Sequence, residues 1–262
     1  MRILINFVKT IIKSNKLFII LGEKIATNLN INFEDEYLIA SYVKSPTIID
    51  VGAHIGESIF NFKKNSKNSK IYSFEPNRNL FKKLEKVKKR YKNVKIYNYA
   101  LSNTKIQNLY VPSAYGIDLS LWSTLNLNYL KNRWINFTNI NFKKISLKKI
   151  KIRSKKLDYF KINPHIIKID AEGSEYEIIK SAKKTISKNL PILIIEFHNK
   201  NYKKIKFELK KYGYSDYIFS SKNNKLIKIN NSNINQIRKK KTSTNLVFYC
   251  KNSNLLQTKL ID

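Results

Sequence analysis

Residues 48–56 read IIDVGAHIG, and this stretch decides the predicted fold. An apolar run followed by glycines predicts a buried strand that turns tightly into a helix. Gly52 allows the backbone to bend sharply and approach a ligand closely. The helix N-terminus that follows would offer unpaired N–H groups to an anionic group. Since Gly52 and Gly56 lie four residues apart with His54 between them, the G-x-G-x-x-G pattern is absent and dinucleotide binding is disfavoured.

Short apolar runs alternate with helical patterns along the rest of the chain. Strands are predicted at 47–51, 70–74, 94–100, 165–170, 191–197, 214–219 and 245–249, and helices at 57–64, 79–91, 174–187 and 202–212. Such alternation indicates βαβ units and a parallel sheet. We therefore expect a Rossmann-like α/β fold with a mostly parallel seven-stranded sheet, whose last two strands form an antiparallel hairpin at one edge.

The chain of 262 residues suits one α/β domain with additions. We expect a helical extension over residues 1–46, the main domain over 47–250 and a tail over 251–262. Residues 112–150 break the rhythm with polar sequence and interleaved aromatic residues. An insertion before the fourth strand would hang over the carboxyl ends of the strands, where open α/β sheets bind ligands. We interpret it as an acceptor-binding cap, with an ordinary surface excursion as the equal alternative.

Lysine dominates the composition. The chain has 51 Lys and Arg, only six of them Arg, against 18 Asp and Glu, for a net charge of +33. Codon bias explains much of the lysine, because Lys, Asn and Ile share A/T-rich codons. The shortage of Arg disfavours evolved bidentate phosphate recognition. The positive field still suits anionic membrane surfaces, nucleic acid and acidic glycans, and charge alone does not choose among them. Half of the acids lie in 50–75 and 158–196, so we expect some of them to serve a site.

The N-terminal segment carries the only membrane signal. Residues 3–21 predict a basic amphipathic helix, which we expect to pack on the core, with contact to an anionic membrane surface as the alternative. Its charges are too frequent for a spanning helix or a secretory signal. Cys250 is the single cysteine and lies in an apolar run, so we predict a buried thiol. The expected location is cytoplasmic, with a peripheral membrane contact as the alternative.

Three strand ends suggest a nucleotide-like ligand. Asp50 precedes the first glycine and suits a cationic group, such as an amine. Glu75 ends the second strand 25 residues later, one βα unit along, and can accept hydrogen bonds from two ribose hydroxyls. At the end of the third strand, Ala100 and Leu101 could flank an adenine ring and Ser102 could hydrogen-bond it.

The fourth and fifth strands end in acids and a histidine. Asp170 and Glu172 follow the fourth strand and are our site candidates, whereas Glu175 and Glu177 begin a helix, where acids are favoured anyway. At the end of the fifth strand, alternation places Glu196 and His198 on the same side. His198, one of three histidines, is a candidate general base near neutral pH, with a partly buried surface histidine as the equal alternative.

Together these segments resemble the FkbM-type methyltransferase family. The resemblance rests, in order, on IIDVGAHIGES (48–58), YSFEP (72–76), YALSN (99–103), KLDYF (156–160), IIKIDAEGSEYEII (166–179) and PILIIEFH (191–198). It implies a class I methyltransferase fold with S-adenosylmethionine as methyl donor. It also implies O-methylation of a hydroxyl on a sugar, glycan, glycolipid or natural product.

The resemblance also implies roles for single residues. By matching position, Asp50, Gly52 and Gly56 would line the methionine end, Glu75 the ribose, and Asp170 the region of the sulfonium. His54 stands where the family commonly has Asn; because it keeps a hydrogen-bonding side chain, we expect it to serve the donor too. Residues 1–46 and the insertion are not covered, and we expect them to determine the acceptor.

For the reaction, we expect a base to remove the acceptor's proton, with His198 as first choice and Asp170 or Glu196 next. We predict no metal; a divalent metal held by Asp170, Glu172 and Glu196 is the alternative. Two rival functions remain. One is nucleic-acid methylation, disfavoured because Asn163-Pro164-His165 precedes the fourth strand and lacks the second proline of the usual motif. The other is a non-catalytic basic module that binds membranes or glycans.

Overall fold

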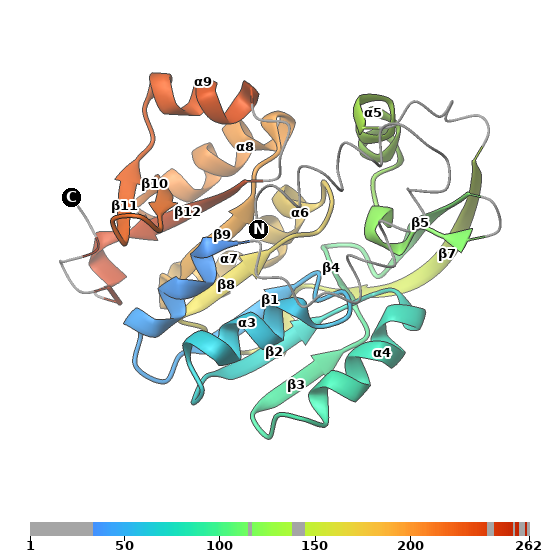
Figure 1. Cartoon of the computed structure of the whole chain (residues 1–262), viewed down its shortest axis with the longest axis horizontal. Coiled ribbons are helices and arrows are strands. Elements are labelled where there is room, and N and C mark those ends of the chain that lie inside the picture. Colours follow the sequence, from blue (N-terminus) through green and yellow to red (C-terminus); the bar gives the residue numbers. More distant parts are fainter. Residues whose placement is uncertain are drawn as a thin grey trace.

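The structure is a computed structural model that describes residues 34–114, 117–137, 145–239, 244–253, 255–256 and 260 (Figure 1). The predicted N-terminal helix at 3–21 lies outside the described residues, and its membrane contact stays a prediction. Of the helices that are described, none has both the length and the apolar character needed to span a membrane.

An eight-stranded sheet forms the centre of the fold, in the order β11-β10-β12-β9-β8-β1-β2-β3. Its strands are β1 (Thr47–Val51), β2 (Lys70–Phe74), β3 (Val94–Tyr97), β8 (Ile166–Ile169), β9 (Ile192–Glu196), β10 (Tyr214–Ser220), β11 (Lys225–Lys228) and β12 (Asn245–Cys250). The pairs from β9 through β8, β1 and β2 to β3 are parallel, whereas β12 runs antiparallel to both β9 and β10. The predicted Rossmann-like fold is confirmed.

Both faces of this sheet are covered by helices, which explains why its strands are rich in isoleucine. On one face lie α3 (Glu57–Asn65), α4 (Arg78–Lys88) and the 3-10 helix η1 (Asp35–Tyr42). On the other lie α6 (Glu175–Ser181), α7 (Lys183–Asn189), α8 (Asn199–Lys210) and α9 (Asn231–Lys239). In β1, for example, Ile48 packs with the first group and Ile49 with the second, and neither side chain is exposed.

The structure corrects several sequence predictions. The sheet has eight strands rather than seven, because β11 adds a further edge beside β10; the predicted hairpin is therefore an antiparallel β10–β12 pair that does not form the edge. The third predicted strand divides into β3 and the short β4 (Ala100–Leu101). The long helix predicted at 174–187 breaks at Ala182, between α6 and α7. Within the predicted helical extension over residues 1–46, the described part forms the 3-10 helix η1.

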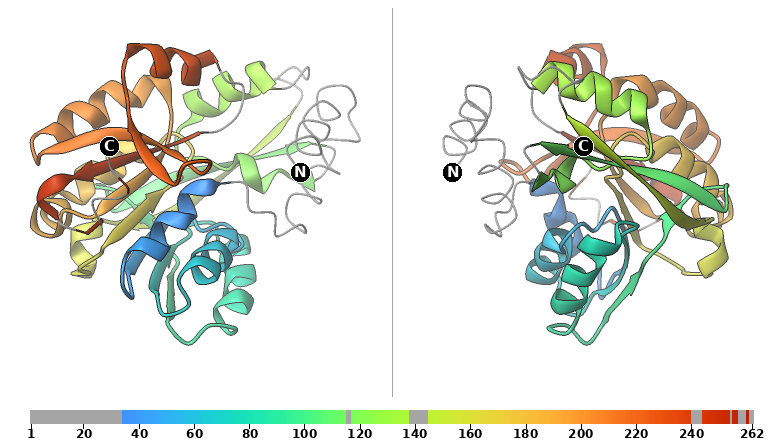
Figure 2. Two further views of the ribbon diagram at one scale, coloured as in Figure 1. Left: turned by 60° about the vertical axis from the view of Figure 1, so that its left-hand side comes forward. Right: turned by 90° about the vertical axis from the view of Figure 1, so that its right-hand side faces the viewer.

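The insertion is larger and more regular than the predicted 112–150. It comprises β5 (Ile106–Ala114), β6 (Ile117–Asp118), the 3-10 helix η2 (Ser120–Trp122), α5 (Leu127–Phe137) and β7 (Ser146–Lys155). With β4, its strands form a second sheet in the order β4-β7-β5-β6. Figures 1 and 2 show this second sheet and α5 together at one end of the main sheet. Its two ends meet, because Ser154 N donates to Lys105 O at 2.8 Å.

Candidate functional site

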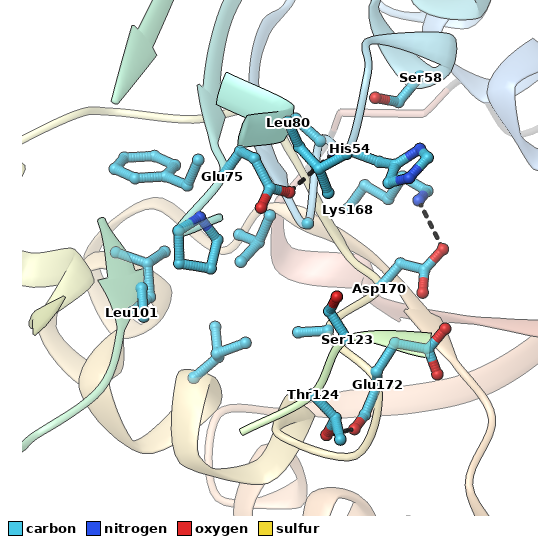
Figure 3. Close-up of a pocket in the computed structure, with 18 of the residues that line it drawn as sticks. His54, Ser58, Glu75, Leu80, Leu101, Ser123, Thr124, Lys168, Asp170 and Glu172 are labelled. Atoms are coloured by element: carbon cyan, nitrogen blue, oxygen red, sulfur yellow. Dashed lines mark hydrogen bonds and ion pairs between the residues drawn. The ribbon is translucent and has the colours of Figure 1, made fainter. Parts of the chain in front are cut away.

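A cavity of about 270 Å³ lies at the carboxyl ends of β1, β2 and β8, beneath the insertion (Figure 3). Of the residues predicted for the site, seven line it: Gly52, His54, Glu75, Ala100, Leu101, Asp170 and Glu172. The insertion adds Leu109, Ser120, Ser123, Thr124 and Leu125. The cavity therefore joins the predicted donor segments to the segment that we interpreted as the acceptor cap.

Gly52 is irreplaceable where β1 meets β8. Its φ is +84°, and a Cβ built on it would lie 1.8 Å from the carbonyl oxygen of Asp170. No side chain fits this distance, and the left-handed backbone conformation disfavours other residues as well. The two backbones can therefore lie side by side at the floor of the cavity. His54 also has a positive φ, +50°, a conformation in which Asn and His are enriched.

Glu75 joins the turns that follow β1 and β2. Its carboxylate accepts a hydrogen bond from His54 N at 3.0 Å and another from Asn77 N at 2.7 Å. Burial raises the pKa of Glu75 to about 7, and these hydrogen bonds and His54 oppose that shift only in part. An ionised carboxylate offers about four lone-pair sites, so two remain for the hydroxyls of a ligand. The predicted ribose acid is thus held rigidly in the cavity wall.

An apolar slot extends from Glu75 toward the insertion. Its described wall includes Pro76, Leu80, Leu101, Leu109 and Ile178. Such a surface suits the face of a flat ring, as predicted for Ala100 and Leu101. Ser102 is absent from the described wall: it is buried, and its hydroxyl lies 3.0 Å from that of Thr104. A direct hydrogen bond from Ser102 to an adenine ring has no support in this arrangement.

Asp50 and Gly56 are likewise absent from the described cavity wall. Asp50 is fully buried, and its Oδ2 accepts hydrogen bonds from Ser58 at 2.6 Å and Ser73 at 3.0 Å. Burial raises its pKa, against the opposing effects of Lys168 and both serines. Gly56 instead faces α4, where an added Cβ would lie 3.0 Å from Val87. Both residues shape the turn from behind rather than contact a ligand directly.

The polar end of the cavity centres on an ion pair that the sequence analysis missed. Lys168 is 3% exposed, and its ammonium lies 3.1 Å from Asp170 and 3.9 Å from Glu34. Burial opposes its charge, but Asp170 and Glu34 outweigh burial and raise the pKa of Lys168 well above its usual value. A lone charge within the apolar strand β8 was the available signal. This pair fixes the orientation of Asp170 in the cavity (Figure 3).

His198 and Glu196 are absent from the described cavity wall. The Nε2 atom of His198 lies 2.7 Å from Glu196 and 3.5 Å from Glu175. Burial disfavours the charged imidazole, but hydrogen bonds to Glu175 and Glu196 outweigh burial and raise the pKa of His198 to about 10. At neutral pH the ring therefore carries a proton, which argues against its predicted role as first-choice base.

Carboxylates gather around these groups. The ligating atoms of Asp170, Glu172 and Glu196 lie within 4.8 Å of one another, and so do those of Glu175, Glu196 and His198. Carboxylate oxygens are the ligands that Mg²⁺ and Ca²⁺ prefer. Glu175 already accepts hydrogen bonds from Ala171 N and Gly173 N, so its main part is to hold the loop. The first set is the one that the sequence analysis named as the metal alternative.

Comparison with known proteins identifies a methyltransferase domain in the chain. The methyltransferase FkbM domain matches residues 50–215. A comparison with curated proteins gives no match. Among solved structures, the chain is similar to an FkbM methyltransferase from Methylobacillus flagellatus KT, at 17% identity and a TM-score of 0.49, over 93% of this chain and 57% of that one. It thus spans little more than half of that protein's length.

Two further solved structures are similar at lower identity. One is precorrin-6y C5,15-methyltransferase from Geobacter metallireducens GS-15, at 10% identity and a TM-score of 0.44, over 82% of this chain and 85% of that one. The other is a SAM-dependent methyltransferase from Aquifex aeolicus, at 11% identity and a TM-score of 0.43, over 87% and 97%.

The cavity fits S-adenosylmethionine, the methyl donor that the FkbM domain implies. Gly52 lets the backbones of β1 and β8 form the floor of the cavity, Glu75 offers acceptor sites for ribose hydroxyls, and the apolar slot suits an adenine ring. The matched segment contains all seven predicted residues that line the cavity and covers more than half of the chain. The chain therefore belongs to the FkbM methyltransferase family.

Proposed function

We propose that the protein is an O-methyltransferase whose acceptor is a hydroxyl of a sugar, glycan, glycolipid or natural product. The observation that carries this proposal is the division of one cavity into two ends. Glu75 and the apolar slot form a nucleoside-binding end, whereas Asp170, Glu172 and insertion hydroxyls form a polar end. A methyl group transferred at the boundary would reach a polar acceptor held beneath the insertion.

The character of the polar end supports a neutral acceptor. Its described wall carries the carboxylates of Glu34, Asp170 and Glu172 beside the hydroxyls of Ser120, Ser123 and Thr124. Its one lysine, Lys168, is paired with acids. Carboxylates and hydroxyls both bind the hydroxyls of a sugar well, whereas the carboxylates repel a phosphate, which disfavours nucleic acid as the acceptor. In a chain with a net charge of +33, this local excess of acid is a specific feature.

The residues at the boundary have distinct tasks. When bound, S-adenosylmethionine supplies a methyl group that a hydroxyl oxygen can attack, so that a C–O bond forms and the S–C bond breaks. Glu75 and the apolar slot orient the donor, and exclusion of water strengthens the polar contacts. The hydroxyl proton must pass to a base. Because His198 is protonated at neutral pH, we place Asp170 first, with Glu196 as the next candidate.

A metal-assisted route is the second candidate. The closeness of the Asp170, Glu172 and Glu196 oxygens, within 4.8 Å of one another, favours it. A divalent ion there would lower the pKa of the acceptor hydroxyl and reduce the need for a base. Assays with and without EDTA separate the routes. Full turnover after chelation would exclude the metal-assisted route. If turnover is lost and Mg²⁺ or Mn²⁺ restores it, a bound metal takes the place of the carboxylate base in our scheme.

The first test is calorimetric titration of the protein with S-adenosylhomocysteine, with Glu75→Ala as the control. We expect saturable binding that the control loses. Transfer of label from S-[methyl-³H]adenosylmethionine to neutral sugars, glycolipids and RNA would then identify the acceptor class. Donor binding without transfer to any acceptor would favour the non-catalytic module. If the folded protein does not bind the donor product at all, the methyltransferase proposal fails.

A further inference from the structure

The loop from Asp170 to Gly173 has a conformation that it cannot keep alone. Glu172 has a φ of +51° and Gly173 a φ of +94°. A left-handed conformation at a residue other than glycine is uncommon, and it persists only where neighbouring groups hold it. Both Asp170 and Glu172 line the polar end of the cavity. The contacts that hold this loop therefore decide where two acceptor-facing carboxylates lie.

Part of the support comes from the main domain. The Oε1 atom of Glu175 accepts hydrogen bonds from Ala171 N at 3.3 Å and Gly173 N at 2.9 Å. Asn201, on α8, donates through Nδ2 to Gly173 O at 3.2 Å. These contacts fix the two residues that flank Glu172. They do not explain what fixes Glu172 itself.

The insertion supplies the missing contacts. Thr124 Oγ1 donates to Glu172 O at 2.6 Å, and the Tyr129 hydroxyl donates to Glu172 Oε2 at 3.0 Å. The Tyr129 ring also covers Gly173, where an added Cβ would lie 2.7 Å from Cγ of the ring. On its other side the ring meets His198 edge to face, with centroids 4.7 Å apart. One tyrosine from α5 thus contacts the loop at two successive residues.

We propose that Tyr129, aided by Thr124, is a positioning residue for acceptor binding. It acts through Glu172, whose carboxylate it orients toward the polar end of the cavity. A carboxylate held in this way can accept hydrogen bonds from hydroxyls next to the reacting one, which would fix the ring of a sugar acceptor. The proposal rests on the methyltransferase function proposed above. It concerns the acceptor end only, because Glu75 is held by His54 N and Asn77 N.

Three hydroxyl variants test the proposal. Tyr129→Phe removes the hydrogen bond to Glu172 Oε2, and Thr124→Val removes both the bond to Glu172 O and the bond from Asn126 N. Both variants keep most of the side-chain volume, and Thr124→Ser restores the hydroxyl. Tyr159→Phe is the matched control, because Tyr159 is 62% exposed and lies outside the described cavity wall. Hydrogen–deuterium exchange measures the loop in peptides that cover residues 168–176. Titration with S-adenosylhomocysteine measures the donor end separately.

We expect Tyr129→Phe and Thr124→Val to speed amide exchange in the loop about fivefold or more, the factor for one lost hydrogen bond. Affinity for S-adenosylhomocysteine should stay within about twofold, because the donor end shares none of these contacts. Thr124→Ser and Tyr159→Phe should match the unchanged protein. Unchanged loop exchange in Tyr129→Phe would overturn the proposal. So would equal loosening of residues 50–56, which would indicate a general structural role.

Turnover provides a readout that a purely structural role would not give. With the acceptor found by the label-transfer screen, Tyr129→Phe should raise the acceptor KM about fivefold or more, with a smaller change in kcat. The effect should vanish when Glu172→Ala is already present, because that variant leaves the Tyr129 hydroxyl without the carboxylate through which it acts. Additive effects would refute the assigned route. If the unchanged protein does not bind S-adenosylhomocysteine, the proposed function fails while the loop measurement still decides whether Tyr129 holds Glu172.

Discussion

The two ends of the cavity are built in different ways. The donor end comes from neighbouring parts of the chain, since Gly52, His54 and Glu75 belong to one βα unit and its next strand. The polar end, which we propose binds the acceptor, joins segments far apart, because Tyr129 and Glu172 are separated by 43 positions and meet through the insertion. The donor end therefore has a pattern that sequence displays, whereas the acceptor end exists only after folding.

The largest effect should come from the floor that both ends share. Gly52→Ala would place a methyl group 1.8 Å from Asp170 O and also strain a φ of +84°. We expect a loss of more than about 3 kcal/mol in the free energy of unfolding and no binding of S-adenosylhomocysteine. Thermal and denaturant unfolding measure the first, and calorimetry the second.

Gly213→Ala is the matched control for that variant. Gly213 has a similar φ of +80°, but its added Cβ would meet only the Cys250 sulfur, at 3.3 Å. The free energy of unfolding of Gly213→Ala should therefore fall only by the conformational cost, about 1–2 kcal/mol, and donor binding should be kept. If the free energy of unfolding falls equally in both variants, the close approach of β1 and β8 at Gly52 adds nothing to the conformational cost of alanine.

Asp170→Asn should give the next largest effect, on turnover rather than on donor binding. If Asp170 accepts the acceptor's proton, turnover should fall about 100-fold or more. His198→Gln should lower turnover less, because His198 is already protonated at neutral pH. Initial rates with the identified acceptor compare the turnover of the two variants. A donor titration of each variant shows whether its donor binding is unchanged. A greater loss in His198→Gln would restore the histidine as the base.

Glu75→Gln probes the donor end alone. The amide keeps the size of the side chain but loses the charge and one acceptor position. S-adenosylhomocysteine affinity should fall about tenfold to hundredfold, as expected for hydrogen bonds to a charged group. Acceptor KM should change little once the donor is saturating. A variant with normal donor affinity would remove Glu75 from the ribose site.

The pH dependence of donor affinity should be smaller. Ribose hydroxyls donate best to an ionised carboxylate, and the pKa of Glu75 is raised to about 7 by burial. Calorimetric affinity should thus fall about tenfold from pH 8 to pH 6, and this trend should be absent in Glu75→Gln. The contribution of Glu75 to the stability of the free protein changes with pH in the opposite direction to donor affinity. Because the folded protein holds the proton more tightly, stability of the free protein should fall as the pH rises from about 4.5 through about 7.

The smallest expected effect is an absence of change. Three histidines allow each ring signal to be assigned by single substitutions. The His198 signals should not titrate between pH 6 and 8, since Glu175 and Glu196 hold its pKa near 10. NMR of the ring carbons and protons measures this directly. A midpoint near 6.5 would show that the two carboxylates do not hold its proton.

The same contrast explains what could be predicted from sequence. β1 and β2 have the predicted bounds because buried isoleucines and following glycine or proline mark them clearly. β11 was missed because it has one buried residue, Leu226, at an exposed edge. At the site, Gly52, Glu75 and Asp170 follow apolar strands and have a local signal. Tyr129 has none, because an aromatic residue in a helix that also contains Leu130 and Trp134 looks the same whether or not it reaches Glu172.

The meeting of the two ends of the insertion has a consequence for engineering. Because Lys105 and Ser154 are hydrogen-bonded neighbours, the insertion between them leaves the main domain and returns to it at adjacent positions. A segment attached in this way can be exchanged without moving the main sheet, at the modest entropic cost of closing a different loop. Chimeras that join other segments at residues 105 and 154, and that keep an apolar residue in place of Leu109 in the slot, are therefore an economical way to exchange the proposed acceptor end.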